Sequence, residues 1–485
     1  MLYSIVYGSV AVYNKMEVFL MMGYLEELLR ALRPAFSRQA TFVWFLVAFA
    51  GVVMRQDLYG VSSIIRALSL APVYYPALLH FFHSTAWSAE RLYRQWEGWL
   101  IGQPVVERVA GRIVMLGDHT KQPKDGRRMP HITTMHQDSE TSSKPSFFRG
   151  HHWGCLSLLG QAEGKRFALP LWAEIHPEDS PDSRATRLVH VAAAIGLRLQ
   201  EKLFLVLDAF FSVGPVFLAA AESNGRVQIL TRAKKNIVAY RQPPPPRAHR
   251  RGRRRLYGQK LKLMSLFDKR PQDFLSAEAL VYQKQETVHY LVLDLIWKPA
   301  NGLVRFILIE TSRGRLILMS SDLTLGALQA LSLYTARARI ESLFASVKNI
   351  LGGLAYHFWS KYLAPTSRRP TRGIHPTPVS SQPQRTANTL AAIEKFMALH
   401  LIVLGSLQLL SATFADAVRE NARCWLRTPS VSVPSDFVSR TALANLLHAN
   451  IRGLGKNPIT ESIRRKQSAP QESREKPIAR KQKAA

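Results

Sequence analysis

The sequence holds few cysteines and few acidic residues. Only two of its 485 residues are cysteines, Cys155 and Cys424. Two thiols cannot build a disulfide framework or a zinc site made of cysteines, and they fit a reducing cytoplasm. The 34 acidic residues face 65 lysines and arginines, which gives a formal net charge of +31. This excess predicts a polyanionic partner, most often nucleic acid and less often an anionic membrane surface.

The first 54 residues offer no clear membrane span. Residues 41–54, TFVWFLVAFAGVVM, form a short run, whereas a membrane span needs about 20 residues. Residues 1–22 are largely apolar but lack the basic start and the small-residue cleavage site of a signal peptide. We therefore expect a buried core helix at 41–54, no membrane partner and a cytoplasmic location. A membrane-associated basic protein is an alternative that rests on residues 1–54 alone.

The first half of the chain changes pattern near residue 108. Residues 1–107 show helical apolar spacing interrupted by prolines and predict an all-α region. In residues 108–235, the runs RIVMLGD (112–118) and LFLVLD (203–208) each end in an aspartate. Such runs suit buried strands of a mixed sheet, and TRLVHVAAAIGLRLQ between them predicts a helix. The fold class expected here is α/β.

The second half begins with a different block at residues 236–320. Four prolines and an arginine run open it, and three strand-like runs follow, HYLVLDLIW, LVRFILIE and RLILMSSD. They predict a β-rich insertion, after which the sheet domain resumes at 321–363. Beyond it we expect a linker at 364–386, a helical region at 387–455 and a disordered basic tail at 456–485.

Three acidic residues are candidates for a shared metal site. Asp118 and Asp208 end the two apolar runs, and Glu341 is the one acid of YTARARIESLFASVK at 334–348. Three carboxylates that converge at one end of a mixed sheet can hold two Mg²⁺ ions, because Mg²⁺ prefers oxygen ligands. Two such ions about 4 Å apart serve phosphoryl transfer. An aspartate at a strand end is by itself more often a turn residue, so the hypothesis depends on all three.

The segment around Glu341 has a polar stripe. On a helix of about 3.6 residues per turn, Tyr334, Glu341 and Lys348 lie seven apart and Arg337 lies one turn before Glu341. A solvated face with an ordinary ion pair is the alternative interpretation. The apolar residues on the other side are predicted to pack inward: Ile340, Leu343, Val347 and Leu351.

The spacing Y-x2-R-x3-E-x6-K resembles the YREK signature of bacterial DDE transposases of the insertion-sequence-4 type. GDHTKQPKDGRRMPHI at 117, LVLDAFFS at 205 and GGLAYHFWSK at 352 are similar to further segments of that family. The likeness covers roughly residues 25–362. It implies an RNase H-like catalytic core that is interrupted by the β-rich insertion and flanked by helical regions.

The resemblance also implies roles for individual residues. The catalytic and metal-binding residues would be Asp118, Asp208 and Glu341, with two Mg²⁺ ions that Mn²⁺ can replace. The predicted DNA-binding residues are Tyr334, Arg337, Lys348, Arg232, Lys234 and Lys121. Lys121, Lys124, Arg127 and Arg128 follow Asp118, and a solvated loop and a DNA-facing loop are both open interpretations for them.

The resemblance further implies cut-and-paste transposition by 3′ end hydrolysis, hairpin formation and resolution, and strand transfer. The partners would be double-stranded DNA, as terminal inverted repeats and as target, with a homodimer in the synaptic complex at the bacterial nucleoid. A catalytically inactive DNA-binding descendant is the alternative.

One feature of the family is missing. Its members stack a flipped base on a tryptophan of the insertion, but the matching strand RLILMSSD has none. Trp297, two strands earlier, is predicted to be a half-buried strand aromatic.

Overall fold

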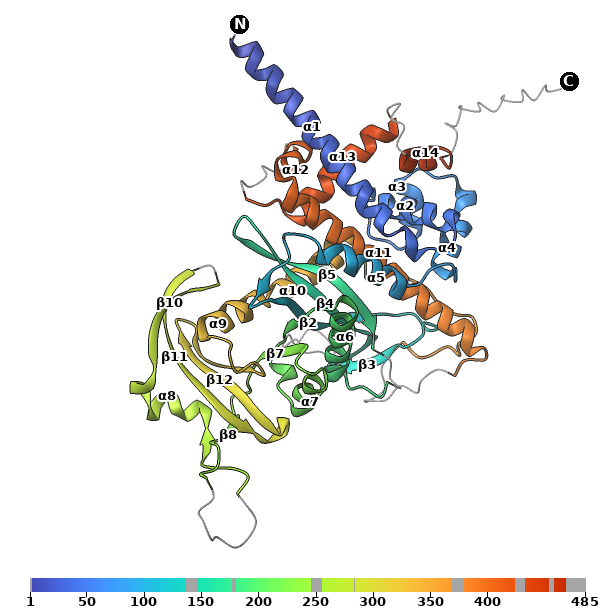
Figure 1. Ribbon diagram of the computed structural model, residues 1–485. Helices are drawn as coiled ribbons and strands as arrows, with labels where there is room; N and C mark the ends of the chain where they lie inside the picture. Colours follow the sequence, from blue (N-terminus) through green and yellow to red (C-terminus); the bar gives the residue numbers. More distant parts are fainter. Residues whose placement is uncertain are drawn as a thin grey trace, which may run out of the picture.

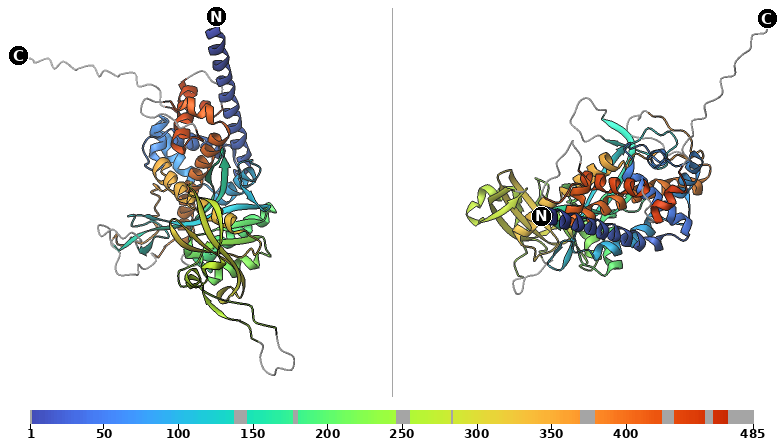
Figure 2. Two further views of the ribbon diagram at one scale, coloured as in Figure 1. Left: turned by 90° about the vertical axis from the view of Figure 1, so that its left-hand side faces the viewer. Right: turned by 90° about the horizontal axis from the view of Figure 1, so that it is seen from above.

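The computed structural model describes residues 2–136, 146–176, 180–245, 255–282, 284–368, 379–423, 432–452 and 458–467. One large mixed sheet runs through the molecule, and helices from both ends of the chain gather at one end of it (Figures 1 and 2). Most of the predicted tail and most of the arginine run at 250–255 lie outside the described residues.

The helical end is built from the two ends of the sequence together. The helices are α1 (Leu2–Ala31), α2 (Gln39–Met54), α3 (Ser62–Ala67), α4 (Tyr75–His83), α5 (Ala89–Ile101), α11 (Pro383–Thr413), α12 (Ala415–Asn421), α13 (Asp436–Arg452) and α14 (Pro458–Arg464). Helix α11 packs against α2, α4, α5 and α13 and is buried on nearly all sides over its second half. The apolar run at 41–54 forms α2, most of which is buried as predicted.

Helix α11 is also long and apolar enough to cross a membrane. However, 83% of its most apolar window is buried inside the protein. Burial on this scale is typical of the core helix of a folded protein. Such a helix carries apolar residues on all of its sides because all of its sides pack against other elements.

The expected disorder of the tail is wrong for residues 458–467. Helix α14 buries Ile463 and packs against α2. The Gln467 side chain donates a hydrogen bond to the Leu68 carbonyl at 3.0 Å. The segment is largely polar and packs through few apolar residues, so its composition did not predict that it packs against α2.

The central part of the sheet has the strand order of an RNase H-like core. Its strands are β2 (Arg112–Pro123), β4 (Phe147–Ala162), β5 (Lys165–Ile175), β6 (Leu203–Val206) and β7 (Val227–Arg232). They lie in the order β5-β4-β2-β6-β7, with β6 and β7 parallel to β2 and β4 antiparallel to it. Helix α6 (Arg184–Leu199) forms the crossover from β5 to β6, and helix α7 (Gly214–Glu222) forms the crossover from β6 to β7. The predicted α/β class with helical flanks is confirmed.

The β-rich insertion extends this same sheet. Its elements are β8 (Val238–Tyr240), β9 (Lys260–Lys262), α8 (Leu266–Lys269), β10 (Leu275–Val281), β11 (Lys284–Trp297), β12 (Gly302–Thr311) and β13 (Gly314–Ser320). Strand β13 pairs with β7, with Leu318 opposite Arg232, so the sheet continues from the core into the insertion. Trp297 is only 4% exposed and packs edge-on against Phe217, which leaves it more deeply buried than predicted.

The helix predicted around Glu341 is broken. Helix α9 (Ala327–Ala336) ends in a turn at residues 337–338, α10 (Arg339–Ala345) follows, and a π-helical turn covers Ser346–Leu351. The predicted inward face is confirmed: Ile340, Leu343, Val347 and Leu351 are at most 2% exposed. Burial of this face fixes the segment even though its backbone is irregular.

Candidate active site

Asp118 lies within a strand and not at its end. Strand β2 continues to Pro123, and Asp118 is paired with Cys155 of β4. The parallel pairing with β6, however, stops at Leu116 and Val206. Asp118 therefore extends just beyond the carboxyl end of β6, where side chains of an open α/β sheet meet ligands.

Asp208 follows β6 at the same end of the sheet. Its Oδ1 accepts a hydrogen bond from the Phe210 backbone N–H at 3.0 Å. Its carbonyl oxygen accepts a hydrogen bond from the Thr231 hydroxyl, which joins it to the neighbouring strand β7. These two contacts fix the backbone and the carboxylate together.

Glu341 reaches the aspartates through Arg337. The Arg337 guanidinium donates to Asp118 Oδ2 at 3.2 Å and to Glu341 Oε1 at 3.0 Å. Arg337 lies in the turn between α9 and α10, so the break in the helix supplies the residue that joins the helix to β2. The Asp118 and Arg337 side chains are 19% and 16% exposed, whereas Glu341 is 62% exposed.

The three carboxylates influence one another electrostatically. The pKa of Asp118 is raised to about 6, first of all by burial; the charges of Asp208 and Glu341 contribute to the rise, and the His119 N–H and Arg337 oppose it. Burial also raises the pKa of Asp208; the Phe210 N–H and Arg337 oppose this shift, while Glu341 adds to it. Ionised together, these groups concentrate negative charge that a cation would stabilise.

The donor set fits a hard divalent cation. Three carboxylates offer the oxygen ligands that Mg²⁺ and Mn²⁺ prefer. Within the described part of the chain, no three His, Cys, Asp or Glu side chains already stand close enough to form a metal cluster. Arg337 meanwhile binds two of the three carboxylates. The three carboxylates are thus suited to a divalent cation, and the Arg337 guanidinium balances part of their negative charge.

The other predicted helix residues surround the carboxylates. Tyr334 is half-buried, with its ring centre 6.0 Å from the Arg337 guanidinium carbon. Burial raises the Tyr334 pKa, and the charges of Arg337 and Arg232 oppose that shift. Burial lowers the pKa of Lys348, and the nearby Cys155, which is the partner of Asp118 in β4, opposes the shift. Tyr334, Arg232 and Lys348 are therefore all within electrostatic range of the site.

The remaining predicted DNA contacts lie farther out. Lys234 is exposed in the turn that follows β7. Lys121 is on β2 beyond Asp118, and its ammonium donates to the His136 carbonyl at 3.0 Å. Lys124 is buried: it donates to the carbonyls of Leu354 and Tyr356 at 2.6 and 2.9 Å. The DNA-facing interpretation is wrong for Lys124, because its hydrogen bonds hold the chain that follows the Glu341-bearing segment at residues 339–351.

Two arginines that the sequence did not single out hold the end of this helix. Arg440 of α13 donates to the carbonyl of Ile350 at 2.6 Å. Arg55, at the end of α2, donates to the carbonyl of Leu351. The last carbonyls of a helix lack intrahelical partners, so these arginines satisfy them. Nothing in the local sequence of the helix indicates partners so distant along the chain.

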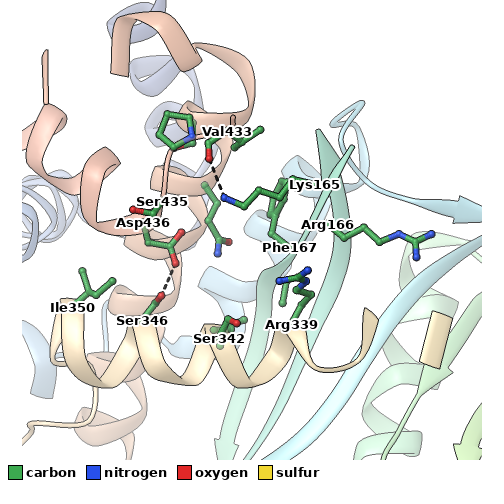
Figure 3. Close-up of a pocket in the computed structure, with 15 residues that line it drawn as sticks. Lys165, Arg166, Phe167, Arg339, Ser342, Ser346, Ile350, Val433, Ser435 and Asp436 are labelled. Atoms are coloured by element: carbon green, nitrogen blue, oxygen red, sulfur yellow. Dashed lines mark hydrogen bonds between the residues drawn. The ribbon is translucent and has the colours of Figure 1, made fainter. Parts of the chain in front are cut away.

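A cavity of about 250 Å³ lies behind the helix α10 that carries Glu341 (Figure 3). Arg339, Ser342 and Ser346 line it, on the side of the helix that faces away from Glu341. Across the cavity, Ser346 is hydrogen-bonded to Asp436, and Lys165 donates to the Val433 carbonyl at 2.9 Å. The cavity thus separates the helix from the C-terminal helices and does not open onto the carboxylates.

Comparison with known proteins bears on this site. No curated protein matches the sequence closely enough to count as a relative. Among solved structures, the chain resembles the piggyBac transposase synaptic complex with hairpin DNA at a TM-score of 0.37 and 11% identity, over 90% of this chain and 74% of that one. Residues 31–289, more than half of the sequence, match the DDE superfamily endonuclease family. The chain therefore belongs to the DDE superfamily of endonucleases.

Proposed function

We propose that the protein is a DNA transposase of the insertion-sequence-4 type that moves its element by cut-and-paste phosphoryl transfer. The observation that carries this proposal is the convergence of Asp118 and Glu341 on Arg337, with Asp208 close enough to raise the pKa of Asp118. Membership of the endonuclease superfamily supports the same reaction class.

The proposed reaction assigns a role to each group. Asp118, Asp208 and Glu341 would hold two Mg²⁺ or Mn²⁺ ions, which would supply activation of the attacking oxygen and stabilisation of the leaving oxygen. Tyr334, Arg337, Lys348 and Arg232 bind the phosphates that flank the scissile bond. Arg337 exchanges its carboxylate partners for a phosphate when metal and DNA arrive, because bidentate contact with phosphate suits a guanidinium equally well. Water hydrolyses the phosphodiester at the 3′ end of the element, and the freed 3′ hydroxyl attacks the opposite strand, which forms a hairpin and releases the flanking DNA. A second water opens the hairpin and frees the 3′ hydroxyl again, which then attacks a phosphodiester of target DNA.

The proposed partners follow from the same chemistry. The protein binds the terminal inverted repeats of its element and target DNA, as a homodimer on the paired ends, at the nucleoid in the bacterial cytoplasm. The net charge of +31 supports a polyanionic partner and predicts that binding weakens steeply with salt. Lys234 and Lys121 add contacts outside the catalytic centre.

Cleavage of a plasmid that carries the flanking DNA of the gene tests the proposal. With Mg²⁺ or Mn²⁺, the wild type should cut at the element boundaries, and Asp208→Asn should lose at least about 10²-fold in rate. Asp416→Asn, at a 71% exposed aspartate of α12, is the matched control and should cut normally. Binding without cleavage by the wild type would favour the inactive DNA-binding descendant. Absence of both would contradict the proposal.

A further inference from the structure

Trp359 is a large aromatic side chain that stands in solvent. It is 63% exposed, whereas tryptophan is usually largely buried in proteins. Its neighbours Tyr356 and Phe358 are buried, while His357 is exposed like Trp359. Because alternate residues of an extended chain point to opposite sides, His357 and Trp359 share one outer face. Trp359 is thus exposed because Tyr356 and Phe358, on the opposite side of the same segment, are buried in the core.

Trp359 borders a hollow of about 430 Å³ with an excess of positive charge. Three arginines line it, and one acid faces them: Arg127, Arg128, Arg368 and Asp125. His357 lies in the same wall. An aromatic face beside several guanidinium groups can bind a flat, anionic ligand by stacking and by charge.

The walls of the hollow are held by backbone contacts. The Ser360 N–H donates to the Arg128 carbonyl at 2.9 Å, and the Arg128 guanidinium donates to the Lys361 carbonyl at 2.9 Å. Arg127 uses its Nε to donate to the Thr366 carbonyl at 3.2 Å. Arg127 and Arg128 are therefore each oriented by a bond to a backbone carbonyl and have further N–H groups for a ligand, which is the preorganisation that a binding site needs.

We propose that this hollow binds an unpaired nucleotide of the DNA substrate, with the base stacked on Trp359 and the adjoining phosphates on the three arginines. The inference rests on the proposed function. Stacking on an aromatic side chain combined with cationic backbone contacts is the physical basis of single-strand binding. A paired base is excluded from the stack because its faces are already covered within the duplex.

The site would lie several nucleotides from the scissile phosphate. Strand β2 runs from Asp118 to Pro123 and leads directly to Arg127. At about 3.3 Å per residue, the five residue steps from Asp118 to Pro123 span roughly 17 Å, which is the length of about five base pairs. The hollow is therefore separate from the catalytic centre and would hold a strand that has left the duplex on that side.

Binding without divalent metal tests this inference independently of cleavage. The probes are a blunt duplex of the element end and the same duplex with a short single-stranded thymine tail, in EDTA. The wild type and Trp359→Phe should prefer the tailed duplex, and Trp359→Ala should lose about tenfold in affinity for it. Leu197→Ala, at a 65% exposed side chain of α6, is the matched control and should bind as the wild type does. A 2-aminopurine in the tail should be quenched by the wild type but not by Trp359→Ala.

Three outcomes would overturn the inference. They are a wild type without tail preference, a Trp359→Ala variant that keeps both preference and quenching, and free thymidine monophosphate that binds as tightly as the tail. The last would identify a small-nucleotide site. Since the assay needs no metal, a wild type that prefers tails but cuts nothing would contradict the proposed function and leave this site standing.

Discussion

At the scale of single residues, Arg337 is the feature that organises the site. It binds Asp118 and Glu341 and opposes the rise in the pKa of both aspartates. A buried carboxylate without a counter-charge is costly. Arg337 therefore supplies the positive charge that offsets the cost of keeping the half-buried Asp118 carboxylate ionised.

Asp118 should still make the metal-free protein less stable as pH rises. Its pKa is raised to about 6 from an ordinary value of 3.8, so the folded state favours the protonated acid. That stabilisation is complete below about pH 3.8 and is lost as pH rises to about 6. The shift corresponds to a free energy of unfolding of up to about 3 kcal/mol. Asp118→Asn, which cannot ionise, should therefore be more stable than the wild type at pH 7 by up to that amount.

Chemical denaturation in EDTA between pH 3.5 and about 7.5 measures this difference. The gain from Asp118→Asn should be near zero at the acidic end and should reach its full value above about pH 6. The exposed-site variant Asp416→Asn should show no such growth. A gain that is the same at every pH would mean that Asp118 ionises normally.

At the scale of elements, the sequence predicted the strands of the core and the buried face of the segment at residues 339–351, which carries Glu341. Apolar periodicity is a local signal, and Ile340 and Val347 carried it. The break at residues 337–338 and the π-helical turn were not predictable, because distant residues such as Arg440 hold that backbone. The pairing of β7 with β13 was not predicted for the same reason, because the sequence of one strand does not determine which other strand it pairs with.

Gly352, at the end of the π-helical turn, should be the sharpest test of this geometry. Its φ is +68°, and an added Cβ would stand 2.9 Å from Arg55 Nη2 and 2.9 Å from Leu58 Cβ. Gly164 has a φ of +72° with open space around it. Gly164→Ala should therefore cost about 1 kcal/mol for backbone strain alone. Gly352→Ala should cost at least about 1–2 kcal/mol more, because Arg55 must also give up its place at the Leu351 carbonyl.

Unfolding by denaturant measures both glycine variants, and cleavage assays show whether the added strain reaches Lys348. Gly164→Ala should cut DNA at the wild-type rate, whereas Gly352→Ala should cut more slowly. Equal losses of stability in the two variants would show that crowding around Arg55 is relieved without cost.

At the scale of the whole molecule, helices from the two ends of the chain together hold the segment that follows Glu341. Arg440 donates to Val53 of α2 at 3.1 Å as well as to Ile350. Helix α5 is fixed to the sheet through Trp96, which donates to the Pro170 carbonyl at 2.7 Å. Gly405 of α11 lies so close to this tryptophan that a Cβ there would approach it to 2.3 Å. The helical end and the sheet are thus packed as a single core.

This shared core predicts that the sheet domain, which carries Asp118, Asp208 and Glu341, does not fold without the C-terminal helices. A chain that ends at residue 378 keeps the whole sheet and all three carboxylates but loses α11, whose removal uncovers the apolar faces of α2, α4 and α5. Because the burial of α11 is almost complete over its second half, the loss far exceeds the roughly 5–15 kcal/mol by which proteins are stable. Circular dichroism should show no cooperative unfolding for this chain. A chain that ends at residue 467 retains α14 and should unfold cooperatively, near the melting temperature of the full protein. A truncated chain that melts cooperatively would mean that the sheet folds alone and that the helices were added to an independent nuclease core.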